Sequence, residues 1–475
     1  MSDSMESLLL AIDVGTTSIK FVIFNEERVI YTKSARIKTF KEADKATQSP
    51  TDILTSIKLN IKEITALYSD IDTISFSTAM HTLIPISHEA EHDTMFLWSD
   101  NRAADTILEF KKNSQRTFLF YNKTGTPIHG MSPFAKLLHF KEKSNSWFNN
   151  VSVWHDMKSF LMSYFVNEFV TDFSIASATG LFNSMDFKWD EDILSFLQLS
   201  DSKLPRLVHP KTIFNISKKA SLELSLKPNT KIMIGASDGC LASLASSQQN
   251  STAENLTLGT SGSIRQLSTT RYLGSYMESF CYYLDTDKWV VGGPTNNGGI
   301  VLEWLSDLFY DDKAEIFAQL KHLGKAPDLF FFPYMQGERA PIWNEKETGS
   351  FKGLNITHGR PEIIQSVLEG IIFNLKYILS LLPVTHDKNP LVLNGGTVQN
   401  KEIAQMIASV FNRECHVSNR TEPTQGLFYW WKKGKEIETT LTNVYLPVES
   451  EQDYYNEKFG KFVEVLETEI RLEGT

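Results

Sequence analysis

Blocks of hydrophobic positions alternate with polar turns along this chain and predict strands and helices in a regular order. The apolar run Leu8–Ile12 ends on Asp13, and a polar Gly-Thr-Thr-Ser turn separates it from a second run, Phe21–Phe24. Two strands joined by a tight turn account for this pattern. Apolar residues then recur at helical spacing over 50–68, and Ile71–Phe76 is a continuous apolar stretch. These segments predict a helix followed by a buried strand.

The alternation of strands and helices continues to about Asp238, and the second half of the chain then restarts it. Asn255–Ile264 repeats the strand, the Gly-Thr-Ser turn and the apolar continuation of the first hairpin. Further on, Asn296–Gly299 precedes an amphipathic stretch, and Leu391–Gly396 reads as a strand that runs into a glycine turn. Alternating strands and helices predict an α/β fold. We therefore expect two α/β domains, residues 1–244 and 245–475.

The turn of each hairpin has the chemistry of a phosphate cradle. Gly15 and Gly259 let the backbone approach a ligand closely, and the Thr and Ser residues after them offer hydroxyl and amide donors. Asp13, at the mouth of the first turn, suits a hydrated divalent cation. One such hairpin is equally well explained as an ordinary tight turn, but the second copy favours nucleotide binding. The pair resembles the actin-like, ribonuclease-H-like ATPases, in which ATP lies in a cleft between two lobes.

Composition and missing motifs exclude several functional classes. No Gly-Lys pair is followed by Ser or Thr, and no GxGxxG follows a strand, which disfavours P-loop and Rossmann chemistry. A net charge of -10 without a basic run argues against nucleic acid as a partner. The three cysteines are scattered and indicate neither a disulfide framework nor a thiolate zinc site. The acidic N-terminus and the interruption at Asp13 argue against a secretory signal and a membrane span, so we expect a cytoplasmic protein.

Four segments carry candidate chemistry, each with a plainer explanation beside it. Asp238 suits a general base for an alcohol that accepts a phosphoryl group, or a helix N-cap. The clusters Trp98–Arg102 and Trp154–Lys158 combine an indole with polar groups that bind sugar hydroxyls. A core tryptophan beside surface charges explains either cluster as well. His88–His92 matches the HExxH zinc motif, but its short, strand-flanked setting favours a solvated turn, so we interpret it as a decoy.

Two longer segments resemble the signatures of the FGGY family of carbohydrate kinases. Gly349–Leu354 followed by Glu362–Glu369 fits the C-terminal signature of that family at every constrained position. Met131–Leu137 meets the N-terminal signature, but His139 stands where the family usually has tryptophan, which we interpret as a local packing change. The resemblance covers about residues 8–430. It implies ATP-dependent phosphorylation of a sugar, polyol or sugar acid by two actin-like lobes, with ATP and Mg²⁺ required.

The resemblance also implies roles for individual residues. Asp238 would be the general base, and Asp13 would organise Mg²⁺ through water. The residues that would hold the phosphates and adenosine are Thr16, Thr17, Gly259, Thr260, Gly298, Gly299, Gly395, Gly396 and Asn400. The residues that would face the sugar are Met80, His81, Trp98, Arg102 and Asp156, together with Asp238.

The substrate is predicted from weaker resemblances. Gly125–Pro133 and Thr171–Phe182 look most like the members of the family that phosphorylate gluconate. Gluconate carries a carboxylate that needs a cationic partner, and Arg102, Lys158 and His155 are the candidates. We therefore expect conversion of D-gluconate to 6-phospho-D-gluconate. Xylulokinase or another FGGY sugar or polyol kinase is the alternative, and a non-catalytic sugar-binding regulatory protein on the same fold is the alternative from a different class.

The C-terminal part departs from the family pattern in two places. Thr397–Asn400 and Thr421–Trp431 replace the usual Ser-Trp and Ala-Leu-Gly-Ala-rich segments. We therefore expect the adenine end of the nucleotide site to be built differently, which leaves the nucleotide preference open. The resemblance also implies a possible homodimer.

Overall fold

The computed structural model describes residues 7–87, 93–250, 254–310, 313–383, 389–418, 422–433 and 443–470. It divides into two compact units, each of which is mixed α/β. The first comprises Met1–Ala245, Cys281–Trp289 and Glu422–Glu438, and the second comprises Ser246–Phe280, Val290–Thr421 and Thr439–Thr475. Two segments from far along the chain thus return to the first unit. The domain boundary expected after residue 244 stays a prediction.

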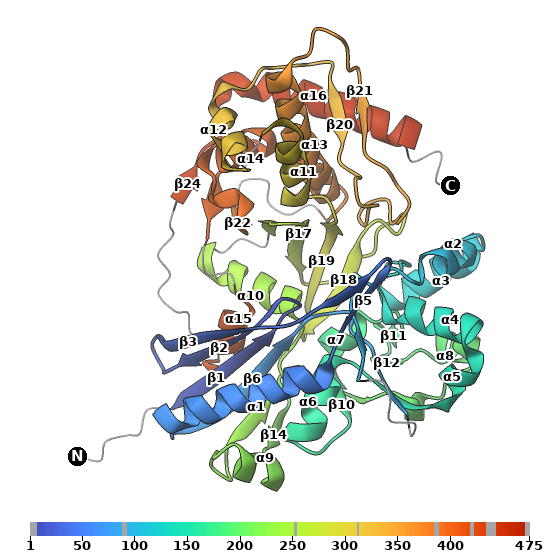
Figure 1. Cartoon of the computed structure of the whole chain (residues 1–475), viewed down its shortest axis with the longest axis vertical. Helices are drawn as coiled ribbons and strands as arrows, with labels where there is room; N and C mark the ends of the chain where they lie inside the picture. Colours follow the sequence, from blue (N-terminus) through green and yellow to red (C-terminus); the bar gives the residue numbers. More distant parts are fainter. Residues whose placement is uncertain are drawn as a thin grey trace. The chain divides into compact units, whose positions relative to one another are not determined.

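The helices and strands follow one another along the chain as shown in Figure 1. Those of the first unit before the chain leaves it are β1 (Leu8–Val14), β2 (Ser18–Phe24), β3 (Val29–Arg36), β4 (Phe40–Glu42), β5 (Lys45–Gln48), α1 (Pro50–Leu67), β6 (Ile71–Thr78), β7 (Ile84–Ser87), β8 (Met95–Phe96), α2 (Ala104–Lys111), α3 (Ser114–Thr124), α4 (Pro133–Lys143), α5 (Asn145–Asn150), β9 (Val151–His155), α6 (Met157–Phe165), β10 (Val170–Asp172), α7 (Phe173–Ser177), β11 (Phe182–Asn183), β12 (Lys188–Trp189), α8 (Glu191–Leu197), β13 (Arg206–Val208), β14 (Ile213–Asn215), α9 (Lys218–Glu223), β15 (Lys231–Met233) and α10 (Asp238–Asn250). The remainder are β16 (Glu254–Leu258), β17 (Gly262–Ser268), β18 (Phe280–Asp285), β19 (Lys288–Thr295), α11 (Gly299–Phe309), α12 (Lys313–Gln319), β20 (Phe330–Phe332), β21 (Ser350–Lys352), α13 (Arg360–Ser380), β22 (Leu391–Asn394), α14 (Lys401–Phe411), β23 (Cys415–Val417), α15 (Pro423–Trp431), β24 (Asn443–Tyr445) and α16 (Gln452–Val465).

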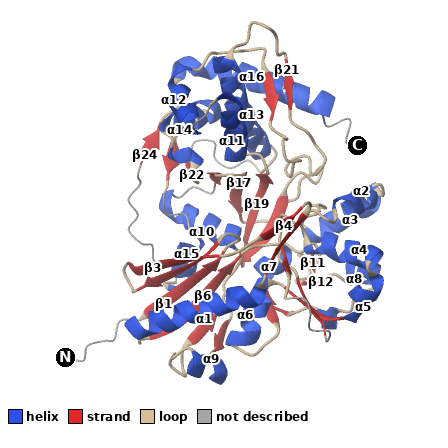
Figure 2. Ribbon diagram, viewed as in Figure 1, coloured by secondary structure: helices blue, strands red, loops and turns tan. Residues whose placement is uncertain are grey.

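A six-stranded sheet forms the centre of the first unit (Figure 2). β1 pairs antiparallel with β2, as the hairpin pattern predicts, and parallel with β6. β15 lies parallel to β6 on its other side, and the full order is β14-β15-β6-β1-β2-β3. The carboxyl ends of β1, β6 and β15 therefore lie along one edge of the sheet, which is the edge that binds ligands in many α/β proteins.

Helices cover both faces of this sheet. Leu10 and Ile12 of β1 belong to an apolar cluster that includes residues of α1 and α6. Leu9 points to the opposite face and is also fully buried. It lies directly across from Phe24 of β2, whose ring contacts Phe428 of α15 at a centroid distance of 4.8 Å. The helix α15, contributed from near the end of the chain, thus covers the second face.

The second unit repeats the arrangement of the first in a sheet whose strands include β17-β16-β22-β23-β24, in that order. β16 pairs antiparallel with β17 and parallel with β22, and β22 pairs parallel with β23. The hairpin β16–β17 therefore corresponds to β1–β2, as the repeated sequence pattern predicts. This α/β repetition confirms the predicted fold class.

The helix α13 forms the centre of the second unit. Among the described helices it is the one long and apolar enough to cross a membrane, but 78% of its apolar window is buried. It packs against β17, β20, α14 and α16. We therefore interpret α13 as a core helix.

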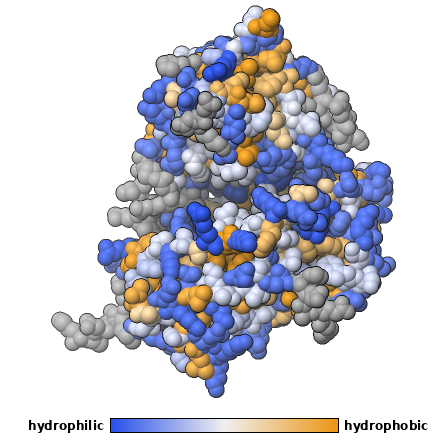
Figure 3. All heavy atoms as spheres, in the orientation of Figure 1, coloured by the Kyte–Doolittle hydropathy of each residue, from blue (hydrophilic) through white to orange (hydrophobic). Residues whose placement is uncertain are grey.

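Apolar residues on the face seen in Figure 3 occur in small groups among polar ones. Exposed large apolar side chains of the described residues are spread over many elements, for example Leu67 of α1, Ile213 of β14 and Leu222 of α9. Scattered residues of this kind are normal on a folded protein.

Candidate functional site

Asp13, Ser77 and Asp238 come from three segments that end at the carboxyl edge of the sheet in the first unit. Asp13 and Ser77 are the penultimate residues of β1 and β6, and Asp238 begins α10 after β15. The Ser77 hydroxyl donates a hydrogen bond of 2.6 Å to Oδ1 of Asp13. A backbone bridge joins Thr78 to Ser237, the residue before Asp238. Two carboxylates that are far apart in the sequence therefore share one edge of the sheet.

The Asp13 carboxyl lies in a negatively charged environment. Its pKa is raised to about 7, mainly by burial and further by the carboxylates of Asp238 and Glu422, against the lowering effects of Ser77 and Lys20. Neighbouring carboxylates of this kind attract a divalent cation, and the cation would displace the proton.

Glu422 is a member of this carboxylate group that sequence reasoning missed. It is the residue before Pro423, the first residue of α15, and it forms an ion pair with Lys20 of β2. The proline at the start of α15 is a helix-start signal, but nothing in that segment points to a partner 402 positions earlier. The sequence showed Thr421–Trp431 only as a departure at the adenine end, whereas Glu422 and α15 belong to the first unit.

Asp238 lies in the first turn of a helix and is partly exposed. It begins α10, and its Oδ1 accepts a hydrogen bond of 2.8 Å from the backbone N–H of Gly239. An acidic side chain in the first turn is stabilised by the positive end of the helix dipole. The structure thus places Asp238 in the first turn of α10, and its role as an N-cap stays a prediction. The position also leaves the half-buried carboxylate able to meet a substrate, so its role as general base stays a prediction.

The turn of the first hairpin is held by its own carbonyl groups. The backbone N–H of Ile37 donates to the Thr17 carbonyl at 3.0 Å, and Nε2 of Gln48 donates to the Thr16 carbonyl at 2.6 Å. The side chain of Thr16 is half-buried and that of Thr17 is exposed. These contacts fix the turn and leave the Thr17 side chain accessible to a ligand.

The glycines predicted to bind nucleotide in the second unit lie against one another. The Gly299 N–H donates to the Gly259 carbonyl at 2.6 Å, and the Ile300 N–H donates to the Thr260 carbonyl at 3.1 Å. A Cβ at Gly298 or Gly299 would lie 2.6 or 2.7 Å from backbone atoms of Ser261 and Gly259. The start of α11 therefore packs directly on the hairpin turn, and a side chain at either position would prevent this approach.

The glycine turn after β22 approaches the same hairpin. Gly395 has φ of +104°, and a Cβ there would lie 2.3 Å from the Leu258 carbonyl oxygen. Gly396 and Gly259, by contrast, face open space. Asn400 caps α14, with its Oδ1 accepting from the N–H groups of Glu402 and Ile403. The structure thus gathers the predicted glycines around one open turn, but gives the Asn400 side chain a structural use.

Glu338 is a second residue whose role sequence reasoning missed. It is fully buried, and its carboxylate accepts from Oγ1 of Thr295 at 2.7 Å, from the Arg339 N–H at 2.7 Å and from the Asn296 N–H at 3.2 Å. Nδ2 of Asn297 also donates to it, at 3.2 Å. Glu338 thereby fixes the loop that leads into Gly298, Gly299 and α11.

The residues predicted to face the sugar all lie in the first unit, in different local settings. His81 has φ of +61°, and its Nδ1 lies 2.7 Å from the Ala178 carbonyl, which indicates an Nδ1–H donor. A left-handed conformation at a residue other than glycine often marks a functional position. Met80 and Trp98 are half-buried. Asp156 is buried and caps α6 by accepting from the Ser159 N–H at 2.8 Å, and burial raises its pKa to about 6.

Two of the three proposed cationic partners for a carboxylate substrate are wrong. The Lys158 side chain is fully buried, and its ammonium contacts Asp172 and two backbone carbonyls. His155 is buried, and burial lowers its pKa to about 4, so the ring is neutral near pH 7. Trp154 is also buried in an apolar cluster, as the plainer explanation of its segment predicts. The sequence could not reveal these environments because each depends on distant segments.

Arg102 is the remaining cationic candidate, and it already has a partner. Its Nε and Nη2 donate to the two carboxylate oxygens of buried Asp100 at 2.7 Å. The guanidinium also lies 4.5 Å from the centre of the Phe96 ring and 5.6 Å from that of Phe140. This bidentate, stacked arrangement fixes the plane of the guanidinium.

The HExxH match and His139 are the two remaining features that the sequence pointed out. The HExxH match, His88–His92, lies outside the described residues. No group of three or more His, Cys, Asp or Glu side chains suited to a metal occurs in the part of the chain that the structure describes. His139 packs edge-on against Phe140, with its Nδ1 3.1 Å from Oγ1 of Thr106, in keeping with a local packing change.

Comparison with known proteins adds independent information. Residues 8–245 match the N-terminal domain of the FGGY family of carbohydrate kinases, and residues 255–425 match its C-terminal domain. The chain is 32% identical over 443 residues to gluconokinase of Bacillus subtilis (strain 168), covering 88% of this chain and 85% of that protein. It is 25% identical over 423 residues to a xylulose kinase of Staphylococcus epidermidis, covering 86% of this chain and 84% of that protein. Two solved Lactobacillus acidophilus structures, a gluconate kinase and a ligand-bound xylulose kinase, each match with a TM-score of 0.90 and 28% identity, over 99% of this chain and 100% of theirs.

Proposed function

The chain belongs to the FGGY family of carbohydrate kinases, and from that premise we propose that it transfers the γ-phosphoryl group of ATP to D-gluconate. The choice of gluconate as the substrate rests on sequence identity, which is 32% to a gluconokinase and 25% to a xylulose kinase over similar lengths. Structural likeness does not separate the two, because both Lactobacillus acidophilus enzymes match equally well. Xylulose is therefore the second candidate substrate.

In this proposal the carboxylate of Asp238 accepts the proton of the reacting hydroxyl. A kinase that acts on an alcohol needs such a base as the phosphoryl group arrives. The half-buried position of Asp238, anchored through Gly239 at the start of α10, supports the assignment. His81 and Arg102, each held by a hydrogen bond or an ion pair, are proposed to orient the sugar, together with Met80, Trp98 and Asp156.

The nucleotide is proposed to bind the two glycine-containing hairpins. Thr16 and Thr17 of the first unit, with Gly259 and Thr260 of the second, would meet the phosphates. The adenosine would lie near the glycine turns that precede α11 and α14. The close packing of Gly298, Gly299 and Gly395 on the second hairpin supports this assignment.

Asp13 and Asp238 also fit a magnesium ion. Mg²⁺ is typically held by one or two carboxylates together with water and substrate phosphates, so a larger set of protein ligands is not needed. The electrostatic coupling between the two carboxylates supports such a site. When bound, the ion would neutralise charge on the transferred phosphoryl group. A cytoplasmic location and a homodimer remain further proposals.

Substrate choice can be tested with a coupled ADP-release assay on gluconate, xylulose, glycerol, ribulose and fuculose. We expect kcat/KM for gluconate to exceed that for xylulose by at least about tenfold, the equivalent of one ion pair or hydrogen bond. A preference for xylulose would overturn the substrate proposal. A lack of ADP release with every sugar would favour the non-catalytic regulatory alternative.

Replacement of Glu338 tests the loop that it fixes in the second unit. Both of its carboxylate oxygens accept hydrogen bonds, so Glu338→Gln would turn an amide donor toward existing donors. We expect KM for ATP to rise about tenfold with a smaller change in KM for the sugar. The control is Glu254→Gln, a buried glutamate of the same unit that pairs with Arg413. Equal effects of the two variants on KM for ATP would contradict the role of Glu338.

A further inference from the structure

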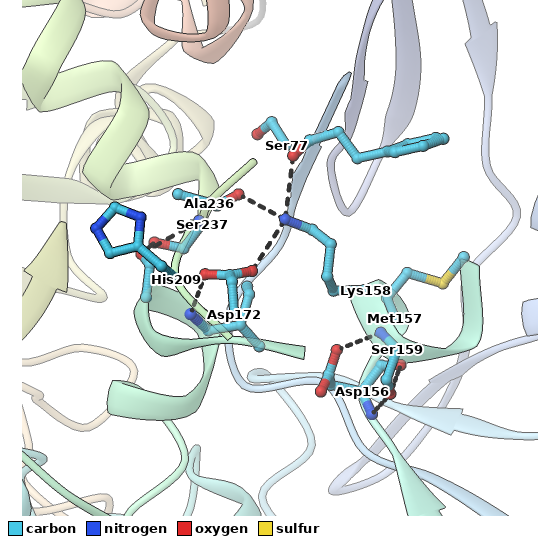
Figure 4. A network of polar contacts seen from close by, with 12 residues as sticks. Ser77, Asp156, Met157, Lys158, Ser159, Asp172, His209, Ala236 and Ser237 are labelled. Atoms are coloured by element: carbon cyan, nitrogen blue, oxygen red, sulfur yellow. Dashed lines mark hydrogen bonds and ion pairs between the residues drawn. The ribbon is translucent and has the colours of Figure 1, made fainter. Parts of the chain in front are cut away.

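Lys158 is a fully buried cation whose contacts join three separate segments of the first unit (Figure 4). Its Nζ donates to the Phe76 carbonyl at 3.1 Å, to the Ala236 carbonyl at 3.2 Å and to Oδ2 of Asp172 at 3.1 Å. These three partners account for the three N–H bonds of an ammonium group. The side chain is therefore committed to the protein and cannot bind a substrate directly.

The two carbonyl partners lie next to the candidate catalytic carboxylates. Phe76 precedes Ser77, whose hydroxyl donates to Asp13. Ala236 lies two residues before Asp238 in the segment that follows β15. The Lys158 ammonium thus links the backbone supporting Asp13 to the backbone supporting Asp238.

The backbone at Gly235 passes very close to the Phe76 carbonyl group. Gly235 has φ of +77°, and a Cβ there would lie 2.0 Å from the Phe76 carbonyl oxygen. The oxygen that accepts from Lys158 therefore lies directly against the segment that leads to Asp238. Only glycine permits this approach, which is independent evidence that the two segments are held at a fixed separation.

Asp172 extends the network to Asp238 by a second route. Its Oδ1 accepts from the Ile175 N–H at 3.0 Å and so caps the short helix α7. In that helix, Oγ of Ser174 lies 2.8 Å from Oγ of Ser237, the neighbour of Asp238. Asp172 thus compensates the charge of Lys158 and orders the helix that contacts Ser237.

The energetic cost of this arrangement argues that it has a use. Burial lowers the pKa of Lys158, and an ammonium taken out of water loses several kcal/mol of solvation unless its partners compensate. Well-packed apolar side chains of similar volume often stabilise a protein as well or better. Stability alone therefore gives no reason to bury Lys158 at this junction.

We propose that Lys158 is a positioning residue that, with Asp172, holds the strand segments of Asp13 and Asp238 in the register needed for phosphoryl transfer. This inference rests on the proposed function of those two carboxylates. Lys158 acts through the Phe76 and Ala236 carbonyls and not by contact with the substrate. Its loss would shift both carboxylates and leave the two carbonyls without their shared donor.

The test compares Lys158→Met with Lys458→Met. Lys458 of α16 is a matched buried ammonium in the second unit, with partners Glu369, the Ala326 carbonyl at 2.6 Å and the Tyr454 hydroxyl at 3.3 Å. Both variants lose a buried ion pair, so both are expected to lower Tm. We expect Lys158→Met alone to lower kcat about 100-fold, the effect of a displacement near 1 Å, with KM values for ATP and sugar within about threefold of wild type.

A milder variant keeps the test decisive if Lys158→Met does not fold. Ser237→Ala removes the hydroxyl contact with Ser174 without burying an unpaired charge. We expect it to lower kcat about fivefold with Tm lowered by only a few degrees, as for one modest hydrogen bond that aligns a reacting group. The inference is overturned if folded Lys158→Met keeps kcat within threefold of wild type, if Lys458→Met loses as much activity, or if Ser237→Ala leaves kcat unchanged. Inactivity of the wild-type protein toward every sugar would instead contradict the proposed function.

Discussion

Asp238→Asn is expected to lower kcat about 1000-fold while the sugar still binds. A general base contributes roughly 10²–10⁴ to the rate, and an amide cannot accept the proton of the reacting hydroxyl. The amide oxygen can still accept from the Gly239 N–H, so α10 should form normally. Coupled ADP-release kinetics would measure kcat, and isothermal titration with gluconate would measure binding.

The control for this prediction is Asp190→Asn. Asp190 likewise lies at the start of a helix of the first unit, where it caps α8 with its Oδ1 accepting from the Ile193 N–H at 3.0 Å. It pairs with Lys123, so its replacement should affect stability and leave kcat within about twofold. If Asp238→Asn turned over as fast as this control, Asp238 would not be the general base.

Asp13→Asn is expected to show the second largest loss, about 100-fold in kcat, because it removes a carboxylate proposed to organise Mg²⁺. The Asn side chain keeps an oxygen that can accept from Ser77, so the local hydrogen bond survives. The loss should shrink as the Mg²⁺ concentration is raised, which a magnesium titration of kcat would measure. A loss independent of Mg²⁺ would contradict the metal role.

The same variant should stabilise the free protein at high pH. The pKa of Asp13 is raised to about 7 in the folded state, so the folded protein binds this proton more tightly than the unfolded chain does. Its contribution to stability is therefore present below about pH 4 and is lost as the pH rises to about 7. Asp13→Asn removes that loss, and we expect it to be more stable than wild type at pH 8 by up to about 4 kcal/mol. Urea unfolding without Mg²⁺ at pH 5 and pH 8 would measure it, and a difference independent of pH would contradict the assignment.

The sequence predicted most of the elements that carry the site, because local patterns determine them. The helix predicted over 50–68 is α1, and the apolar stretch Ile71–Phe76 lies within β6. The hairpin turns, with their glycines, also follow from residues that are neighbours in the sequence. In such segments, hydrophobic spacing and turn chemistry together indicate one structure.

The sequence did not predict the contacts that depend on distant segments. Lys158 follows a tryptophan, a histidine and an aspartate, so it resembles a surface cation in a sugar-binding cluster. Its partners are a carbonyl at position 76, a carboxylate at 172 and a carbonyl at 236. No local sequence pattern predicts that these three distant groups meet at one ammonium. The roles of Glu422 and Glu338 were missed for the same reason, since their partners come from other loops and strands.

Asp156 shows how one residue can fit two patterns at once. Its position relative to the family assigned it to the sugar, whereas the structure shows that it forms a capping box with Ser159 at the start of α6. The cap uses Oδ1 of the carboxylate. A contact between Asp156 and the sugar stays a prediction.

The return of two late segments to the first unit has a consequence for dissecting the protein into pieces. A fragment ending at Ala245 would lack α15, which covers β1 and contacts Phe24. Without it, one apolar face of the central sheet would be left open to water and to other chains, a common cause of aggregation. Expressed alone, such a fragment should be insoluble, and supplying the remaining residues as a second polypeptide during refolding should restore a soluble complex.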